Sequence, residues 1–83
     1  MEKSISSQHL RALLDTLRQT REGASLRQLD VAERLGVPQS FISKYESGER
    51  RLDLLELEQV CEACGTSLFD FLTRYQQNKK AAE

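Results

Sequence analysis

The chain has 83 residues and a formal net charge of −1, with 12 Lys and Arg against 13 Asp and Glu. This length allows one domain with a modest core, and no apolar run approaches the roughly 20 residues of a membrane-spanning helix. Residues 1–10 lack the apolar centre of a signal peptide, and two cysteines are too few for a disulfide framework. We therefore expect a cytoplasmic protein without a membrane segment.

Periodic apolar residues predict five helices and no strand, so the expected fold class is all-α. The first helix spans about Ser7–Arg21, with leucines at positions i, i+3, i+4 and i+7, the spacing of one buried stripe. Ser25 and Gln28 have the spacing of a capping box, in which each side chain bonds the backbone N–H of the other residue. We expect this pair to open the second helix, which ends at Leu35.

A tight corner is predicted after the second helix. Gly36 can take the left-handed conformation that ends helices at little cost. Pro38 holds Val37 extended and lacks an amide hydrogen, so it suits the first turn of the next helix. The third helix then spans about Gln39–Glu46 and closes at Gly48.

Two further helices are predicted, at about Leu54–Cys64 and Leu68–Tyr75. Each has a capping residue before it, Asp53 and Ser67 respectively. The fourth helix is expected to bury one stripe: Leu54, Leu57, Val60, Cys61 and Cys64. The chain is thus divided into a flexible N-terminus at residues 1–6, a helix-turn-helix domain at 7–75, and a polar tail at 76–83 that should fray.

The second and third helices, joined by a glycine-containing turn, form a helix-turn-helix candidate. The residues that press the two helices together are small or apolar: Val31, Ala32, Leu35, Val37, Ile42 and Tyr45. Ala32 matters because the crossing helices leave no space for a large side chain at this position. A polar strip faces outward at helical spacing: Gln39, Ser40, Ser43 and Lys44. Such a strip on a steeply projecting helix is suited to the major groove of DNA.

On these residues the chain resembles the lambda-repressor-like (Cro/CI, or XRE) family of helix-turn-helix regulators. The matching stretches are LRQTREGASLRQLDVAERLG, VPQSFISKYESGERRL and ACGTSLFDFL, and the resemblance covers about Leu10–Leu72. It implies a compact five-helix bundle whose third helix enters the major groove of double-stranded DNA. It also implies a homodimer on a near-palindromic operator, commonly a repressor.

The resemblance assigns base reading to the outward strip of the third helix. It assigns contacts with the DNA backbone to a second group: Arg27, Gln28, Phe41, Arg50 and Arg51. Alternatives stay open for most of that group: Gln28 as part of the capping box alone, Phe41 as a cover for the edge of the bundle, and the loop arginines as solvated charges.

Structural roles are implied for the turn and for one ion pair. Arg21, ending the first helix, matches a position that pairs with Glu46, ending the third, and the pair is expected to orient the third helix. The family often has a serine or threonine where this chain has Pro38, which leaves open the residue that caps the third helix. It also often has a proline where this chain has Leu52.

The last helix carries more apolar residues than one buried stripe requires. Phe69, Leu72 and Tyr75 could form a dimer seam, or they could simply close the core. A dimer would set two recognition helices about 34 Å apart, one turn of DNA. The main rival function is an antitoxin or protein-interaction module of the same fold, which binds a protein partner through its tail or its acidic face.

Two further signals are weaker. Cys61 and Cys64 have zinc-like spacing, but a second ligand pair is absent from the sequence and both fall on the apolar stripe, so core packing is preferred. With His9 as the one histidine, no catalytic triad can form, and we expect neither an enzyme nor a metal or cofactor.

Residues 52–72 carry five acids and no base, which predicts a face turned away from DNA, although ordinary surface charge explains the pattern equally well.

Overall fold

The computed structural model describes residues 7–82, and the expected flexible N-terminus at 1–6 lies outside them. The described residues form five helices and no strand, as the sequence predicts. The helices are α1 (Ser7–Gly23), α2 (Gln28–Leu35), α3 (Gln39–Ser47), α4 (Leu54–Ala63) and α5 (Leu68–Ala81). Within this part of the chain, no helix has the length and apolar character needed to cross a membrane.

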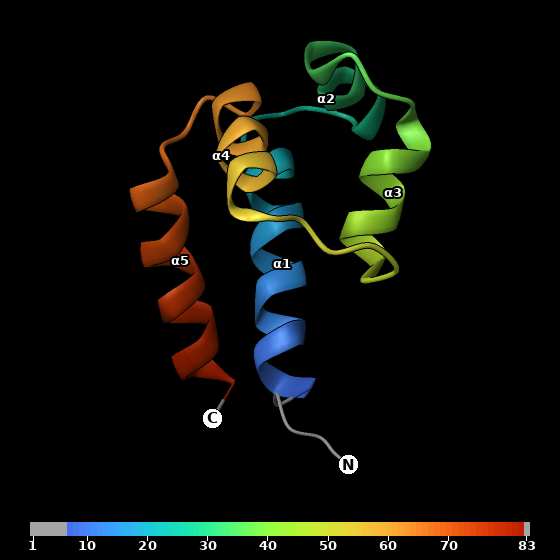
Figure 1. The fold of residues 1–83 in the computed structure, drawn as a ribbon. Coiled ribbons are helices and arrows are strands. Elements are labelled where there is room, and N and C mark those ends of the chain that lie inside the picture. The colour runs from blue at the N-terminus through green and yellow to red at the C-terminus, as the bar shows by residue number, and fades with distance from the viewer. Residues whose placement is uncertain (1–6, 83) are drawn as a thin grey trace.

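The helices are arranged around α1 (Figure 1). α5 lies alongside α1, and the beginning of α1 and the end of α5 are at the same end of the molecule. α2 and α3 pack against each other on the other side of α1, and α4 contacts both α2 and α5. The core lies between these helices and contains Leu17, Val31, Ile42, Tyr45, Val60, Cys61 and Phe71.

Polar groups buried in α1 are all hydrogen-bonded. The hydroxyl groups of Thr16 and Thr20 each donate to the backbone carbonyl four residues earlier, at 2.7 Å. The side-chain amide of Asn78, on α5, donates to the Thr16 hydroxyl at 2.8 Å and to the Gln19 side chain at 3.0 Å. These bonds join the last turns of α5 to the middle of α1.

The predicted end of the last helix at Tyr75 is therefore wrong, because α5 continues to Ala81. Phe71, Tyr75 and Asn78 are spaced by four and three residues, so the inward-facing stripe extends past the predicted end. Since Asn78 finds its partners on α1, a polar residue can occupy that stripe without leaving a buried group unsatisfied.

The predicted opening of the second helix is also wrong. Ser25 has a φ of +61° and belongs to the turn after α1, where its N–H donates to the Glu22 carbonyl at 2.9 Å. α2 begins three residues later, after Arg27, whose backbone N–H donates to the Asp30 carboxylate at 2.7 Å. Ser25 is thus part of the turn between the two helices and does not cap α2.

The other helix ends agree closely with the sequence. The Asp53 carboxylate accepts from the backbone N–H of Glu56 at 2.7 Å, and the Ser67 hydroxyl accepts from that of Asp70 at 3.0 Å. The prediction is wrong for one member of the α4 stripe. The side chain of Leu54 is exposed to solvent, whereas Val60 and Cys61 are buried.

Candidate nucleic-acid interface

The corner between α2 and α3 is built by backbone geometry. Gly36 has φ +70° and ψ +34°, and it follows the last residue of α2 as predicted. The N–H of Val37 donates back to the Ala32 carbonyl at 3.0 Å. The sequence left open which residue caps α3. In the structure Pro38 is the N-cap residue, and no side chain caps the helix by a hydrogen bond.

Buried side chains brace this corner from inside. Val31 and Ala32 of α2 and Ile42 and Tyr45 of α3 are all nearly inaccessible to solvent. Ala32 is 1% exposed, which confirms that the crossing of the two helices is filled at this point. α3 therefore packs against the bundle through its inner face, and its outer face is exposed to solvent.

The outer face of α3 is the predicted polar strip. Gln39, Ser40, Ser43 and Lys44 are all exposed. None of them is packed inside the molecule, which is the arrangement that contact with base edges requires. Reading of bases by these four residues stays a prediction.

The expected pair between Arg21 and Glu46 is present. Arg21 Nε donates to Glu46 Oε2 at 2.7 Å and Nη2 donates to Oε1 at 3.0 Å. Only 11% of the Arg21 side chain and 7% of the Glu46 side chain are exposed. Arg21 Nη1 also donates to the Leu26 carbonyl at 2.9 Å, so the guanidinium connects the end of α1, the following turn and the end of α3. The hydrogen bond to Glu46 is the main reason that the pKa of Arg21 is raised.

A chain of side-chain hydrogen bonds continues from this pair to the outer strip. Gln28 Nε2, at the start of α2, donates to Glu46 Oε1 at 3.1 Å. Gln39 Nε2, at the start of α3, donates to Gln28 Oε1 at 3.4 Å. Sequence reasoning named Gln28, Gln39 and Glu46 but did not connect them with one another, because these contacts arise only where α2 and α3 cross.

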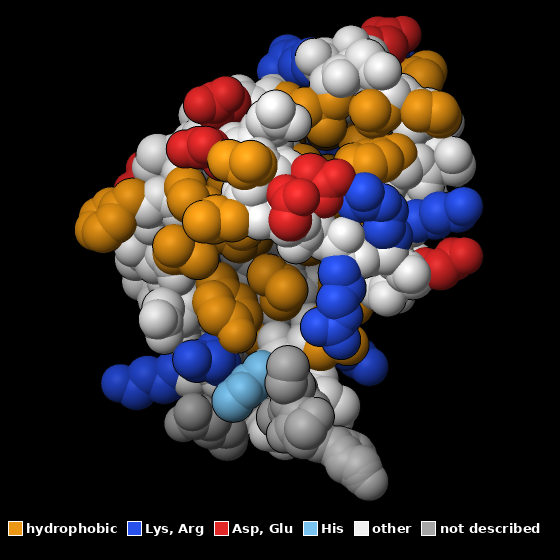
Figure 2. Space-filling view, in the orientation of Figure 1, with side chains coloured by type: hydrophobic (Ala, Val, Ile, Leu, Met, Phe, Trp, Pro, Cys, Tyr) orange, Lys and Arg blue, Asp and Glu red, His pale blue; other side chains and the backbone are white. Residues whose placement is uncertain are grey.

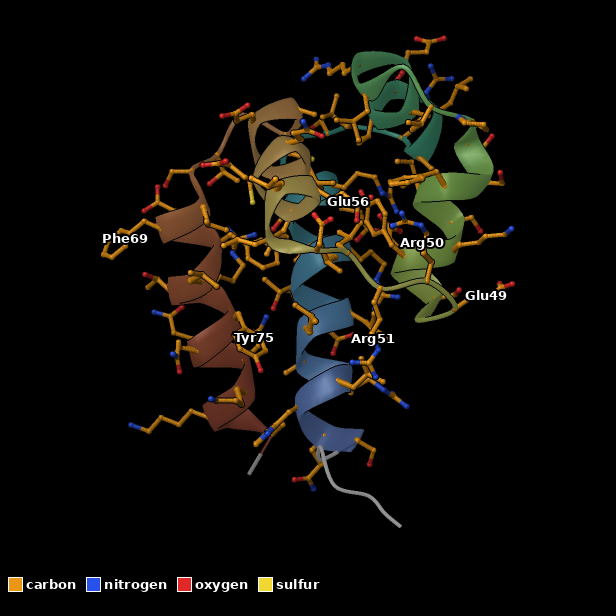
Figure 3. All side chains as sticks on the ribbon, viewed as in Figure 1. Glu49, Arg50, Arg51, Glu56, Phe69 and Tyr75 are labelled. Atoms are coloured by element: carbon orange, nitrogen blue, oxygen red, sulfur yellow. The ribbon has the colours of Figure 1, made fainter. Side chains whose placement is uncertain are left out.

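The loop between α3 and α4 is fastened by Arg50. Its guanidinium donates to both Glu56 carboxylate oxygens, at 2.7 and 3.2 Å, and to the Arg51 carbonyl at 3.0 Å (Figure 3). It also lies 4.4 Å from the centre of the Phe41 ring, which in turn meets Tyr45 edge to face. The bonds from Arg50 lower the pKa of Glu56. Phe41 thus covers the edge of the bundle, the structural alternative that the sequence allowed.

The remaining loop and helix charges are at the surface. Arg51 is exposed, and so is its neighbour Glu49, which points away from the bundle in Figure 3. Arg27 forms a bidentate pair with Asp30, at 2.7 and 3.1 Å, while 75% of its side chain stays exposed. Hydrogen bonds from the Arg27 side chain and backbone lower the pKa of Asp30 to about 2.

The cysteine pair belongs to the core. Cys61 and Cys64 are buried and free, and burial raises the pKa of Cys61 to about 11. Among residues 7–82, no cluster of three or more His, Cys, Asp or Glu side chains is placed to hold a metal ion. The packing interpretation of the two cysteines is confirmed by their burial.

An apolar face lies on α4 and α5, away from the polar strip of α3 (Figure 2). It is defined by four large exposed side chains, Leu54, Leu55, Phe69 and Leu72, which are 65, 70, 78 and 40% exposed. Tyr75, the third predicted seam residue, is half-buried and packs against the core, with Lys79 Nζ 5.5 Å from its ring centre. Sequence reasoning named Phe69 and Leu72 but missed the two leucines of α4.

Comparisons with known proteins agree with this geometry. A family model described as helix-turn-helix matches residues 17–71, a segment that holds the whole corner and the Arg21–Glu46 pair. Among solved structures, an XRE-family like protein from Pseudomonas syringae pv. tomato str. DC3000 is 42% identical, with a TM-score of 0.76. That similarity covers 83% of this chain and 84% of the other. No curated protein matches.

Proposed function

Because the chain belongs to the XRE, lambda-repressor-like family of DNA-binding helix-turn-helix proteins, which are not enzymes, we propose that it is a sequence-specific transcription regulator. It binds a near-palindromic operator as a homodimer, with α3 in the major groove, and represses by occupying the site. The observation that carries the proposal is the exposed polar strip of α3, supported from behind by a fully buried face.

The chemistry of the strip suits base reading. A glutamine such as Gln39 can bond both N6 and N7 of adenine, and a lysine such as Lys44 can donate to N7 and O6 of guanine. Each such contact discriminates by roughly 1–3 kcal/mol when well placed. Ser40 and Ser43 have one hydroxyl each and discriminate less, so bridging water and DNA shape add to their contribution.

Contacts with the DNA backbone are assigned to the residues beside the strip. Arg51 is exposed and offers its full charge to a phosphate, while Arg27 and Gln28 lie at the N-terminus of α2, where an anion is favoured. Arg50 and Phe41 act mainly by positioning this surface, because the arginine is already held by Glu56. A phosphate contact from Arg50 requires the guanidinium to be shared with that carboxylate.

The homodimer is assigned to the apolar face, together with Tyr75. Exposed aromatic and aliphatic side chains of this size are common at protein interfaces. Sedimentation equilibrium should detect a dimer at micromolar concentration, and Phe69→Ser should shift it to monomer. Gln77→Ser is the matched control, because Gln77 is an exposed polar residue of the same helix. A wild-type protein that stays monomeric, with or without DNA, would refute the homodimer.

A selection of genomic fragments, followed by titration of the selected duplex at several salt concentrations, tests the proposal directly. Specific binding should weaken linearly in log–log form as salt rises, with a slope that reflects a few phosphates. Lys44→Ala should change the preferred sequence, and Gln77→Ala should not. Failure to enrich any fragment would contradict sequence-specific binding.

The rival function, a protein-interaction module, is favoured by one observation. The apolar face lies within residues 52–72, which carry five acids and no base, so it offers a partner both apolar and negatively charged surface. A monomeric protein that enriches no DNA but binds one defined partner through Leu55 and Phe69 would favour this function over the regulator.

A further inference from the structure

We infer that a cavity between α1 and the loop that joins α3 to α4 (residues 48–53) binds a small aromatic carboxylate with a ring hydroxyl, and that this ligand weakens DNA binding by occupying Arg51. The cavity has a volume of about 130 Å³. Binding of the ligand is independent of the proposed function, whereas its effect on DNA rests on that function.

The lining of the cavity is mainly apolar. Four leucines come from the stripe of α1, one comes from the loop and one from α4. They are Leu10, Leu13, Leu14, Leu17, Leu52 and Leu57. Since an apolar cavity of roughly 150 Å³ can hold a benzene ring, this one suits an apolar body of about that size.

The charged part of the lining favours an anion. Arg50 and Arg51 both line the cavity, and the described residues around it include no acid. Arg50 is already held by Glu56, at 2.7 and 3.2 Å. The Arg51 guanidinium has no ion pair or hydrogen bond among residues 7–82, and Arg51 is the exposed member of the described lining, located between the loop and α1 in Figure 3. Because a guanidinium can donate two parallel hydrogen bonds to a carboxylate, we assign the carboxylate of the ligand to Arg51, at the mouth of the cavity.

A second polar group of the lining belongs to Tyr45. This residue is 1% exposed, and its hydroxyl has no hydrogen-bond partner among the described residues. Every fully enclosed side-chain nitrogen or oxygen in the same part of the chain has a partner, so the Tyr45 oxygen borders open space, which the cavity provides. Burial raises the pKa of Tyr45, which keeps the hydroxyl protonated and able to donate. A hydroxyl on the ring of the ligand supplies the partner that a buried polar group needs.

Occupation of Arg51 connects the cavity with the proposed DNA-binding surface. Under the proposed function this guanidinium contacts a phosphate, and once it is paired with a carboxylate it no longer offers its full charge to DNA. The ligand and DNA therefore compete for one cation. Each must weaken the binding of the other by the same factor.

Binding is measured without DNA, by NMR of the leucine methyl groups. The probes are benzoate, 3-hydroxybenzoate and 4-hydroxybenzoate. Benzoate should shift the signals of Leu13 and Leu57 with a Kd below about 10 mM, the weak end of the range for a ligand of this size. Benzamide, a neutral molecule of the same shape, should bind about 2- to 5-fold more weakly than benzoate, and Arg51→Gln should remove this difference.

The hydroxyl group is tested by a pair of ligands and a pair of proteins. At least one hydroxybenzoate should bind about 2- to 12-fold more tightly than benzoate, the value of one hydrogen bond. Tyr45→Phe should abolish this advantage and leave the affinity for benzoate unchanged. A hydroxybenzoate advantage that persists in Tyr45→Phe would overturn the assignment of the ring hydroxyl.

A variant that fills the cavity tests its location. Leu13→Phe places a ring inside the lining and should abolish binding of all three probes. Arg18→Gln is the matched control, because Arg18 is exposed on the same helix and does not line the cavity. If circular dichroism shows that Leu13→Phe does not fold, Tyr45→Phe and Arg51→Gln, which change no apolar wall, still decide the question.

The effect on DNA is measured with the duplex obtained by selection. The tighter hydroxybenzoate at saturation, compared with sodium chloride at equal ionic strength, should weaken binding and reduce the log–log salt slope by about 1, and Arg51→Gln should be insensitive to it. A wild type without methyl shifts, or a probe that dissociates the homodimer because a second copy fills the cavity, would overturn the inference and leave the proposed function intact. A protein that binds the probes but no DNA would support the cavity site and overturn the proposed function.

Discussion

Replacing Arg21 by methionine should destabilise the domain by about 3 kcal/mol, the lower end of the range for breaking a buried ion pair. The substitution removes three charge-assisted bonds, at 2.7, 2.9 and 3.0 Å. It leaves the Glu46 carboxylate, 7% exposed, with only a glutamine partner, and it leaves the Leu26 carbonyl without its donor. A domain of this length has a free energy of unfolding of roughly 4–12 kcal/mol, so the loss is a large share of the total.

Urea denaturation followed by circular dichroism measures the loss, and the thermal midpoint should fall by roughly 12–24 °C. Arg18→Met is the matched control on the same helix, because its pair with Asp15 is half exposed and should contribute little. The double variant Arg21→Met with Glu46→Met should be about 1–2 kcal/mol more stable than Arg21→Met alone, since no charge is then left buried. A double variant as unstable as the single one would refute the reasoning from charge burial.

Three further outcomes are expected. Gly48→Ala should destabilise the domain by about 2–3 kcal/mol, because φ is +87° and the new Cβ would lie 3.1 Å from Leu14 Cδ1. Gly36→Ala, at φ +70° with no atom near the new Cβ, should destabilise it by only about 1–2 kcal/mol. The midpoints of urea denaturation compare the two variants. The Cys61 thiol, with a pKa raised to about 11, should resist Ellman's reagent at pH 8 until the protein is unfolded. Because the unfolded thiol ionises near pH 9, its contribution to stability is complete below that pH and is lost as the pH rises toward 11, which unfolding curves at pH 7, 9 and 10.5 would reveal. Arg51→Ala should weaken binding to all duplexes similarly and reduce the log–log salt slope by about 1.

The parts of the fold that could be predicted depend on residues close together in the chain. Gly36 and Gly48 end their helices in the left-handed conformation that only glycine adopts freely, and Asp53 bonds the N–H three residues on. The exposed strip of α3 follows from helical spacing once the buried positions are known. The Arg21–Glu46 pair came from the resemblance, since 25 residues separate its members in sequence.

The errors share a different physical origin, which is the dependence of local structure on distant partners. α5 extends past Tyr75 because Asn78 bonds Thr16, a residue 62 positions earlier. Ser25 is a residue type that often caps helices, but here it lies in the turn after α1 with φ +61°, and its N–H donates to the Glu22 carbonyl. The attachment of Arg50 to Glu56 likewise follows from the position of α4 beside the loop, and no spacing in the sequence indicates it.

The proposed DNA-binding surface belongs to a protein with net negative charge, and three of the acids near it are paired with arginines. Each of three acids around α2, α3 and the following loop is neutralised by its own arginine: Asp30 by Arg27, Glu46 by Arg21 and Glu56 by Arg50. These arginines are thereby prevented from adding their full charge to phosphate attraction, so Lys44 and Arg51 carry most of it. Non-specific affinity should then be weak, because it depends almost entirely on phosphate contacts. Under the proposed function, discrimination between sites has to come from the α3 strip, whose four polar side chains are exposed.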